Sequence, residues 1–349
     1  MERRHRVLAL VFAIAIAVPG IYIAVSFLSA RQQVTIATYR QTASLPVWIA
    51  QDMGFFRNRG LDVQLLEFSG AGLAAHVLVT RGADIGGMPT VLALQNVEAG
   101  VPLRLVHATA DWRAGTSQLL VRSSLPIHSL EDLRGRTIGF EDLATTCLPC
   151  VAFQRVFDAN GIAITRVEVP DYKVEEALNA STVDAAVVTS PYNTFAVEHG
   201  AAYVLVDPRM GPEGDASVAA YGVTPPSGGL PEWMGSAAYW TTTSYLAAKP
   251  DVVHRVARAI ADAAGWLRDP QNLQTARDVL IKYAGGLGTP SYFQAAARAV
   301  LDKTEWRSYP DGYVDWRAME AQRDAFAVVG LVRGDADVRA LVSNPWFQT

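Results

Sequence analysis

Residues 84–90 read Asp-Ile-Gly-Gly-Met-Pro-Thr, and residues 184–190, one hundred positions later, read Asp-Ala-Ala-Val-Val-Thr-Ser. The two stretches align without a gap, and the match continues from Val97–Gly100 to Val197–Gly200 and from Leu105–Val106 to Leu205–Val206. Each copy has the pattern of a buried strand, a hydroxyl residue at a helix start, a helix ending at glycine, and a second strand. Two βαβ units can also resemble each other by chance, but the unbroken register favours a pair of related α/β lobes.

The ends of the two repeated helices are predicted from residue type. Thr90 and Ser190 are placed to act as N-caps, because a hydroxyl can accept a hydrogen bond from a free backbone N–H of the first turn. Gly100 and Gly200 suit the left-handed backbone that commonly ends a helix.

The same alternation of short β-branched runs and longer helical patterns extends along the chain in both directions. Strands are predicted at Val34–Tyr39, Leu61–Phe68, Ala83–Met88, Leu103–Ala110, Leu119–Arg122, Thr137–Phe140, near Val167 and at Ala185–Val188. Helices are predicted at Ser44–Asp52, Ala71–Thr80, Thr90–Glu98, Cys147–Asn160, Lys173–Ala180 and Pro191–His199. Strands separated by helices of about ten residues predict parallel βαβ units, and so an α/β fold.

The pattern changes after Asp207. Met210–Pro231 is rich in Gly and Pro and is predicted to be a loop or hinge region. A strand at Ala237–Thr243 and four helices follow, at Pro250–Arg268, Gln274–Tyr283, Ser291–Leu301 and Tyr313–Phe326. Because no third α/β repeat is visible, we expect this part to pack back onto the first lobe. The predicted domains are a leader (1–30), a discontinuous lobe 1 (34–112 plus 220–349) and a continuous lobe 2 (113–219).

Composition restricts the class of protein. Of the 349 residues, 50% are apolar and 18% charged, with only two Cys, which excludes a disordered chain and a small disulfide-stapled scaffold. The 30 basic and 34 acidic residues give a net charge of −4 and form no basic run, so we expect no nucleic-acid partner.

The N-terminus predicts export. Met1–Arg6 is basic and Val7–Leu28 is apolar, with Pro19-Gly20 in the middle, which is the pattern of a signal sequence with the body outside the cytoplasm. The run is long enough either to be cleaved as a signal peptide or to remain as a membrane anchor, and the sequence leaves both open. A buried core helix fits less well, because the run is N-terminal and flanked by charge. No Cys near the leader supports a lipid anchor.

Catalytic signatures are scarce. The chain contains no Gly-x-Ser-x-Gly elbow, phosphate loop or His-Glu-x-x-His motif, and its six histidines lack metal-ligand spacing. Asp84 and Asp184 stand at equivalent strand starts, where a structural role is expected. The sequence therefore predicts no catalytic residue, no metal and no cofactor.

The one sharp motif is Cys147-Leu148-Pro149-Cys150, at a predicted helix N-terminus, where the helix dipole would lower the pKa of a thiol. In an exported protein a local disulfide is favoured. A redox-active pair and half of a metal site remain alternatives.

Several helix N-termini are expected to converge on one crevice, because the carboxyl ends of parallel strands meet at one edge of a sheet. Their free amides suit an anionic or strongly polar group, and Tyr39, Trp112 and Tyr192 could form an apolar wall. Arg40 and Arg113 fall nearby with Asp111, in either a ligand-pairing or a solvated role. The predicted helix starts are Ser44, Gly70-Ala71-Gly72, Thr90, Thr145-Thr146 and Ser190.

Six segments in order resemble the solute-binding proteins of the nitrate/taurine/aliphatic-sulfonate group of ABC transporters, over about residues 34–349. The first, Ala50-Gln51-Asp52-Met53-Gly54-Phe55-Phe56 followed by Gly60-Leu61-Asp62-Val63, is similar to the distinctive opening of that group. The others are Gly82–Gly86, Gly100–Arg104, Ser129–Gly139, Asp184–Tyr192 and Asp337–Leu341 with Trp346-Phe347.

The resemblance implies a two-lobe type II periplasmic-binding-protein fold, with crossovers near Ala110–Gln118 and Asp207–Tyr221. It implies a monomeric, non-catalytic protein that closes on a small anionic or heterocyclic solute and delivers it to a membrane permease. Candidate solutes are sulfonates, nitrate, and thiamine or flavin precursors. The ligand-binding residues expected by position and from the crevice are Tyr39, Gln41, Ser44, Gly70, Ala71, Gly72, Met88, Thr90, Trp112, Thr145, Thr146, Cys147, Ser190, Tyr192 and Asn193.

Three alternatives remain. One is a tethered sensor or accessory domain, which would need a partner in the membrane because the six-residue cytoplasmic tail is too short to signal by itself. A related enzyme, the thiamine-pyrimidine synthase, carries a His on the helix that begins here near Thr90 and a cysteine-rich iron motif; this chain has Thr90-Val91-Leu92-Ala93 and no cysteine cluster beyond Asp184. A redox protein that uses Cys147 and Cys150 is the other enzyme hypothesis. The Cys-x-x-Cys motif is not usual in the transporter group.

Overall fold

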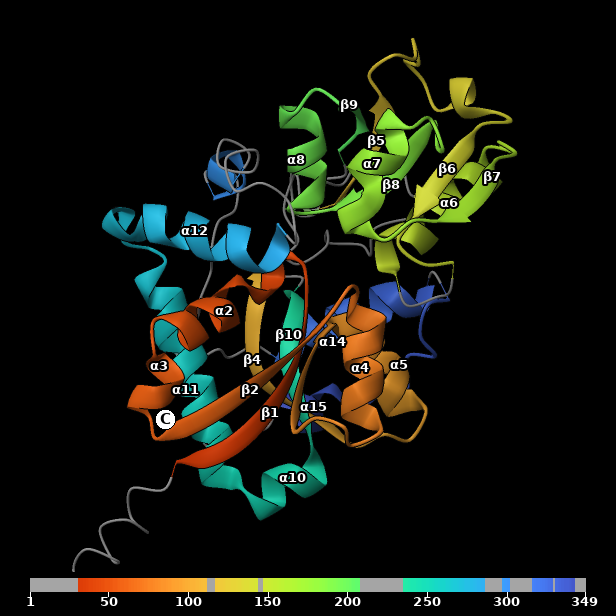
Figure 1. Ribbon diagram of the computed structural model, residues 1–349. Helices are drawn as coiled ribbons and strands as arrows, with labels where there is room; N and C mark the ends of the chain where they lie inside the picture. The colour runs from red at the N-terminus through yellow and green to blue at the C-terminus, as the bar shows by residue number, and fades with distance from the viewer. Residues whose placement is uncertain are drawn as a thin grey trace, which may run out of the picture.

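The computed structural model describes residues 31–111, 117–143, 147–207, 235–285, 297–301, 316–328 and 330–342. In these ranges the chain forms two five-stranded sheets, each covered by helices, and Figure 1 shows them as two separate bodies. We call the body around β1–β4 and β10 lobe 1 and the body around β5–β9 lobe 2. The predicted leader and the residues that join the lobes, 112–116 and 208–234, lie outside the described ranges.

The sheet of lobe 1 has the order β2-β1-β3-β10-β4. Strand β1 (Gln32–Tyr39) pairs in parallel with β2 (Leu61–Phe68) and β3 (Ile85–Pro89). Strand β10 (Gly235–Thr242) runs antiparallel between β3 and β4 (Leu103–Asp111).

The sheet of lobe 2 repeats this arrangement in the order β7-β6-β8-β5-β9. Strand β6 (Thr137–Phe140) pairs in parallel with β7 (Thr165–Glu168) and β8 (Ala185–Thr189). Strand β5 (Ser117–Arg122) runs antiparallel between β8 and β9 (Ala202–Val206). In each sheet the antiparallel strand is the first one after the chain has crossed from the other lobe, so the chain crosses between the lobes twice.

The helices of lobe 1 come from two separate parts of the chain. Helix α11 (Pro250–Trp266) packs on α2 (Leu45–Asp52), α3 (Phe55–Asn58) and β4, and α12 (Leu273–Ala284) packs on α2. Helix α4 (Ala71–Val79) lies on β1 and β3. The remaining helices of this lobe are α5 (Thr90–Glu98), which packs on β10, α10 (Thr243–Ala248), α14 (Trp316–Val328), and α15 (Val338–Val342), which packs on β4.

Lobe 2 is covered by α6 (Leu148–Ala159), α7 (Val174–Asn179) and α8 (Tyr192–Glu198). Short 3-10 turns occur at Thr42–Ser44, Glu131–Leu133, Asp171–Lys173 and Pro270–Asn272. The largest apolar cluster continues from one lobe into the other: it includes Trp48 and Val256 of lobe 1 together with Val174 and Phe195 of lobe 2. The lobes therefore share buried apolar surface, which stabilises their contact.

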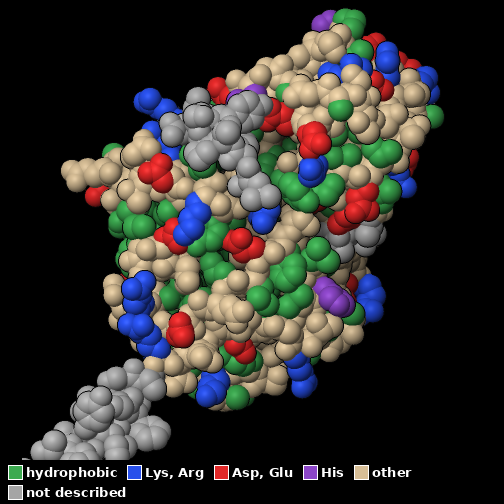
Figure 2. Space-filling model, viewed as in Figure 1, with side chains coloured by type: hydrophobic (Ala, Val, Ile, Leu, Met, Phe, Trp, Pro, Cys, Tyr) green, Lys and Arg blue, Asp and Glu red, His purple; other side chains and the backbone are tan. Residues whose placement is uncertain are grey.

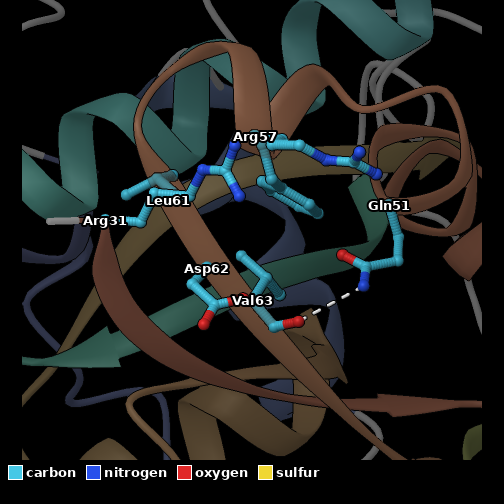
Figure 3. A pocket seen from close by; sticks show the side chains of 7 residues that line it. Arg31, Gln51, Arg57, Leu61, Asp62 and Val63 are labelled. Carbon is cyan, nitrogen blue, oxygen red and sulfur yellow. Dashed lines mark hydrogen bonds between the residues drawn. The ribbon is translucent and has the colours of Figure 1, made fainter. Parts of the chain in front are cut away.

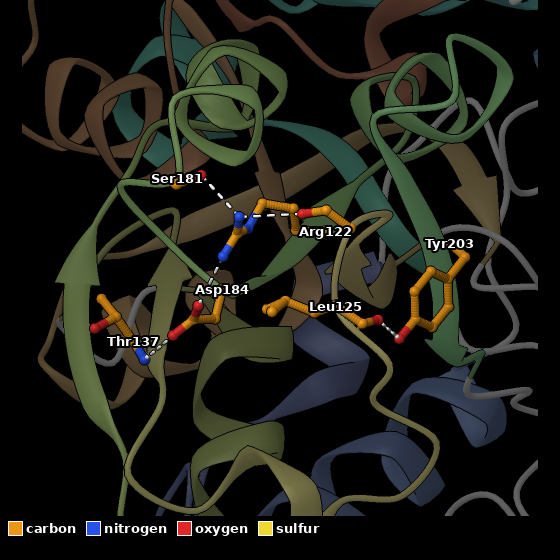
Figure 4. A network of polar contacts seen from close by, with 7 residues as sticks. Arg122, Leu125, Thr137, Ser181, Asp184 and Tyr203 are labelled. Carbon is orange, nitrogen blue, oxygen red and sulfur yellow. Dashed lines mark hydrogen bonds and ion pairs between the residues drawn. The ribbon is translucent and has the colours of Figure 1, made fainter.

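The internal repeat is reproduced in matching hydrogen bonds of Asp84 in lobe 1 and Asp184 in lobe 2. Asp84 accepts a hydrogen bond from the backbone N–H of Thr35 (2.8 Å), and Asp184 accepts one from that of Thr137 (3.1 Å). Both aspartates also donate their own backbone N–H to the carbonyl of the same threonine. Figure 4 shows Asp184 between Thr137 and the guanidinium of Arg122, whose distance to the carboxylate is 3.3 Å. The two carboxylates tie β3 and β8 to their parallel neighbours, so the expected structural role is confirmed.

For the two repeated helices, the predicted glycine C-caps are confirmed and the predicted hydroxyl N-caps are wrong. Gly100 and Gly200 have positive φ values of 91° and 74°, the left-handed conformation expected after a helix. The N-caps of α5 and α8 are Pro89 and Pro191, not Thr90 and Ser190. Proline has φ fixed near the value that a helix entry needs, so the N-cap of each helix lies one position away from the hydroxyl residue.

Among the described helices none is both long and apolar enough to cross a bilayer. The predicted export or anchor segment, residues 7–28, belongs to the part of the chain that is not described.

Candidate functional site

The two lobes meet where β1 ends. After Tyr39 the chain passes through Gln41 and Thr42 into α2, and Thr42 reaches across to lobe 2. The backbone N–H of Thr42 donates to the carbonyl of Ser190 (3.0 Å), and the two hydroxyl oxygens of these residues lie 2.7 Å apart. We call this contact between the carboxyl ends of the two sheets the seam. It is where ligands bind in open α/β sheets.

Two carboxyl groups of lobe 2 face lobe 1 at the seam. Glu141 follows β6 directly, and Asp171 begins the short turn after β7. The side-chain amide nitrogen of Gln41 lies 3.3 and 3.4 Å from the two oxygens of Glu141 and 3.5 Å from Oδ2 of Asp171. Gln41 thus brings one donor from lobe 1 between two acceptors of lobe 2.

Loss of hydration raises the pKa of both carboxyls. Burial raises the pKa of Asp171 to about 7, although hydrogen bonds from Thr189 and Gln41 lower it. Glu141 keeps some contact with solvent, yet burial of its carboxyl, then the neighbouring carboxyls of Asp171 and Asp142, raise its pKa well above the ordinary value. Two neighbouring carboxyl groups that are poorly hydrated repel each other when both are ionised. Such a pair tends to retain a proton or to bind a hydrogen-bond donor.

Aromatic hydroxyl groups surround these acids. Tyr39 is 2% exposed, and burial, Tyr239 and Glu141 raise its pKa. The hydroxyl of Tyr239 lies 2.7 Å from that of Thr38 and donates to Oγ of Ser44 (3.2 Å), and burial raises its pKa to about 12. Tyr192 donates to the backbone carbonyl of Ala284 (2.9 Å), which ties lobe 2 to α12. The tyrosines are therefore neutral donors at neutral pH.

The N-terminus of α4 lies against Glu141. A Cβ atom added to Gly70, the N-cap of α4, would stand 2.8 Å from Oε1 of Glu141, so the missing side chain allows the lobes to approach. Ala71 and Gly72 follow Gly70 in the first turn of α4. The carboxylate of lobe 2 thus occupies the surroundings of a helix N-terminus, where negative charge is favoured.

The structure brings together at the seam several of the residues predicted to bind the ligand. These are Tyr39, Gln41, Ser44, Gly70, Ser190 and Tyr192. Three others have contacts within their own lobe. Asn193 donates to Gln118 Oε1 (3.0 Å), the Met88 carbonyl accepts from the Trp240 indole (3.3 Å), and Thr90 is 1% exposed in the first turn of α5. Trp112, Thr145 and Thr146 lie outside the described residues, as does Arg113.

Cys147 and Cys150 form a disulfide at the start of α6, with Cα atoms 5.2 Å apart. Cys147 is the N-cap of this helix, and its sulfur accepts from the backbone N–H of Cys150 (3.2 Å). Both side chains are buried in the lobe 2 core, at 6% and 4% exposure. The expectation of a thiol with a lowered pKa does not apply to this form, because a disulfide has no titrating thiol.

Sequence reasoning missed Glu141 and Asp171. Both follow the carboxyl end of a parallel strand within three residues. The search for helix starts singled out hydroxyl and glycine residues and so passed over these side chains, although the same strand-end rule applies to them.

A second hollow lies away from the seam. It encloses about 250 Å³ on lobe 1 and is lined by Arg31, Gln51, Phe56, Arg57, Leu61, Asp62 and Val63. Figure 3 shows it beside the first residues of β1 and β2, where Gln51 donates to the carbonyl of Val63 (3.2 Å). This is the amino end of the sheet and belongs to a single lobe, so it lacks the geometry of a site between the two lobes.

Comparison with solved structures gives the fold. The chain is similar to the alkanesulfonate-binding protein SsuA from Xanthomonas axonopodis pv. citri bound to MOPS (TM-score 0.64, 18% identity, 89% of this chain and 96% of that one). It is similar to the periplasmic aliphatic sulphonate binding protein SsuA from Escherichia coli (0.63, 17%, 91% and 99%). It is also similar to the periplasmic nitrate-binding protein NrtA from Synechocystis (0.62, 12%, 89% and 85%). At these identities the likeness shows a shared periplasmic-binding-protein fold, as predicted.

No curated protein sequence matches the chain. A family model described as NMT1/THI5 like matches residues 41–272, a range that begins at Gln41 and contains Glu141, Asp171 and Ser190. This range is more than half of the chain, and the protein therefore belongs to the NMT1/THI5-like family.

Proposed function

We propose that the protein is the extracytoplasmic solute-binding component of an ABC importer. It binds a small solute at the seam between the two lobes and presents the closed form to a membrane permease. Solved relatives of the same fold are named as periplasmic sulfonate- and nitrate-binding proteins, which supports this function.

The observation that carries the proposal is the contact of Gln41 in lobe 1 with Glu141 and Asp171 in lobe 2. Polar side chains that reach across a seam between two separately folded bodies cost free energy unless they meet a partner. A solute that contacts both lobes would hydrogen-bond to these side chains. It would favour the closed arrangement, because it would bind the closed form more tightly than the open form.

Localisation is part of the same proposal. The basic and apolar leader directs the body out of the cytoplasm, either cleaved or retained as an anchor. On the face drawn in Figure 2, basic and acidic side chains are interspersed and form no continuous basic patch, in keeping with a small-molecule partner. We expect a monomer that docks on its permease in the closed form.

A thermal-shift screen tests the function. The purified full chain is mixed with alkanesulfonates, nitrate, amines, amidines, and thiamine and flavin precursors, and a bound solute should raise the unfolding temperature in proportion to the logarithm of its concentration. Gln41→Ala should weaken binding of the stabilising solute about tenfold, because it removes the donor from the seam. Gln64→Ala, on an exposed position of β2, is the matched control and should leave the affinity unchanged. Absence of stabilisation by every class would contradict the function.

A further inference from the structure

The acids at the seam have unused hydrogen-bonding capacity. Oδ1 of Asp171 is buried and has no hydrogen-bond partner, and the residue as a whole is 2% exposed. Oδ2 of Asp171 accepts from the backbone N–H of Thr189 at 3.2 Å. All three contacts of these carboxyls with Gln41 are at 3.3–3.5 Å, longer than an ordinary N–H···O bond. Ionised carboxylates are acceptors only and can take about four hydrogen bonds each.

The described chain places no cation on either carboxyl. The charged or polar groups that interact electrostatically with the pair are Tyr39 at the end of β1, Asp142 beside Glu141, and Tyr192 on α8. Among the described residues, two bases act on neighbouring groups: the charges of Arg40 and Lys282 lower the pKa of Glu67 on β2, and that of Arg40 lowers the pKa of Tyr192. The guanidinium of Arg40 lies 6.0 Å from the ring centre of Tyr172. In the part of the chain that is described, neither Glu141 nor Asp171 takes part in an ion pair.

Gln41 marks the position that a donor can take. Its amide nitrogen is within 3.5 Å of three carboxylate oxygens that belong to two residues. An ammonium or amidinium nitrogen at the same seam could donate to both carboxylates and to the orphaned Oδ1.

We propose that the solute is an organic cation whose ammonium or amidinium group is bound by the carboxylates of Glu141 and Asp171 at the seam. This inference rests on the proposed function and gives its substrate class. It differs from the anionic ligand that the helix N-termini suggested, because the carboxyl group of Glu141 already occupies the N-terminus of α4. A sulfonate at this place would meet two carboxyls, and one or both would have to be protonated.

Probes that share a skeleton and differ in charge test the inference. Binding of benzamidine and benzenesulfonate, and of butylamine and butane-1-sulfonate, is measured on the full chain by thermal shift and calorimetry. We expect the cations to stabilise the protein and the sulfonates to leave it unchanged. Glu141→Gln and Asp171→Asn, which keep the shape of each side chain, should each weaken cation binding at least about tenfold. Glu176→Gln, at a carboxylate 73% exposed on α7, should not.

The pH dependence of the unmodified protein gives a second readout that needs no variant. Cation affinity should rise from about pH 5.5 to about pH 8, because binding favours the ionised carboxyls and releases their protons. Sulfonate affinity would fall over the same range.

The outcomes separate the two proposals. Stabilisation by sulfonates or by another anion of the wider screen, with a falling pH profile, would overturn the inference and leave the proposed function standing. Cation binding that is indifferent to both isosteric variants would also overturn it. A response to no solute of either charge would overturn the proposed function itself.

Discussion

Among the described residues, loss of hydration shifts the pKa of Asp171, Glu141 and His107, and each shift makes stability depend on pH. Asp171 and Glu141 lie at the seam, and His107 lies on β4 with neither ring nitrogen hydrogen-bonded. Burial disfavours the charged form of each group, which raises the pKa of the acids and lowers that of the histidine to about 4. These opposite shifts act in different pH windows, so they can be measured separately.

Replacing Asp171 with Asn should stabilise the solute-free protein at alkaline pH. The pKa of Asp171 is raised from 3.8 to about 7, so between these values the folded state holds a proton that the unfolded state has lost. The free energy of unfolding therefore falls as pH rises through this window, and Asn removes that loss. The gain should grow from pH 5 to pH 7.5 and reach at most about 4 kcal/mol, because each tenfold change in proton affinity corresponds to about 1.4 kcal/mol. Urea unfolding of both proteins measures it, and a difference that does not change with pH would refute it.

Replacing His107 with Leu should protect the protein against acid. The folded-state pKa of about 4 lies below the ordinary 6.5, so the stability associated with the neutral ring is complete above 6.5 and is lost as pH falls toward 4. At pH 5 the free energy of unfolding of the variant should exceed that of the parent by about 2 kcal/mol, relative to their difference at pH 8. Denaturant curves at the two pH values provide the measurement. An equal difference at both would show that His107 does not titrate in this way.

The three groups differ in how far the sequence could reveal them. Glu141 and Asp171 follow strand ends, a place that sequence reasoning treats as functional, so a fuller use of that rule would have included them. Their lack of cationic partners depends on contacts between residues 100 and 130 positions from Gln41, which no local pattern contains. The burial of His107 depends on β10, which inserts beside β4 from the far end of the sequence.

At the level of elements, the prediction was closest where periodicity and end signals agreed. Strand β2 at Leu61–Phe68 and helix α5 at Thr90–Glu98 have the predicted bounds, because each is followed by a turn or a glycine signal. The short helices α3 and α10 were not predicted, since four and six residues are too few to show a helical period. The N-cap positions were wrong because proline, not the hydroxyl residue, sets the entry of α5 and α8.

Adding a single methyl group at the N-terminus of α4 tests whether the two lobes close tightly there. Gly70 has φ −139° and ψ 162°, an extended conformation that alanine also adopts, so the substitution introduces no backbone strain. Its Cβ would stand 2.8 Å from Glu141 Oε1, and the seam must loosen or the carboxylate must move. Gly70→Ala should weaken solute binding about fivefold and lower the free energy of unfolding by only a few tenths of a kcal/mol.

Gly265→Ala is the matched control for this change. Gly265 lies in α11 with no atom within 4 Å of its added Cβ, so alanine should stabilise the helix by about 0.5–1 kcal/mol and leave solute affinity unchanged. Calorimetric titration of both variants compares them. Parent-like affinity in Gly70→Ala would show that the seam does not tighten around α4.

At the scale of the whole molecule, the internal repeat predicted two lobes and the structure has two sheets of the same order. The insertion of β5 and β10 into the middle of their sheets was not evident from local patterns, because it depends on pairing between strands far apart in the sequence. The chain crosses between the lobes twice, so two chain segments join them, which suits a hinge. Hydrogen bonds from Thr42 to Ser190, from Gln41 to Glu141 and from Tyr192 to Ala284 hold the lobes together.

The most direct test of closure around a solute is a measurement of the distance between lobe 1 and lobe 2. Spin labels at Asp62→Cys on β2 and Arg166→Cys on β7, both exposed, report this distance by pulsed electron paramagnetic resonance, and the native cysteines are bonded to each other. With a solute that raises the unfolding temperature, the distance distribution should shift from a broad range to one narrow population. A distribution that is identical with and without such a solute at saturation would contradict closure around a bound ligand.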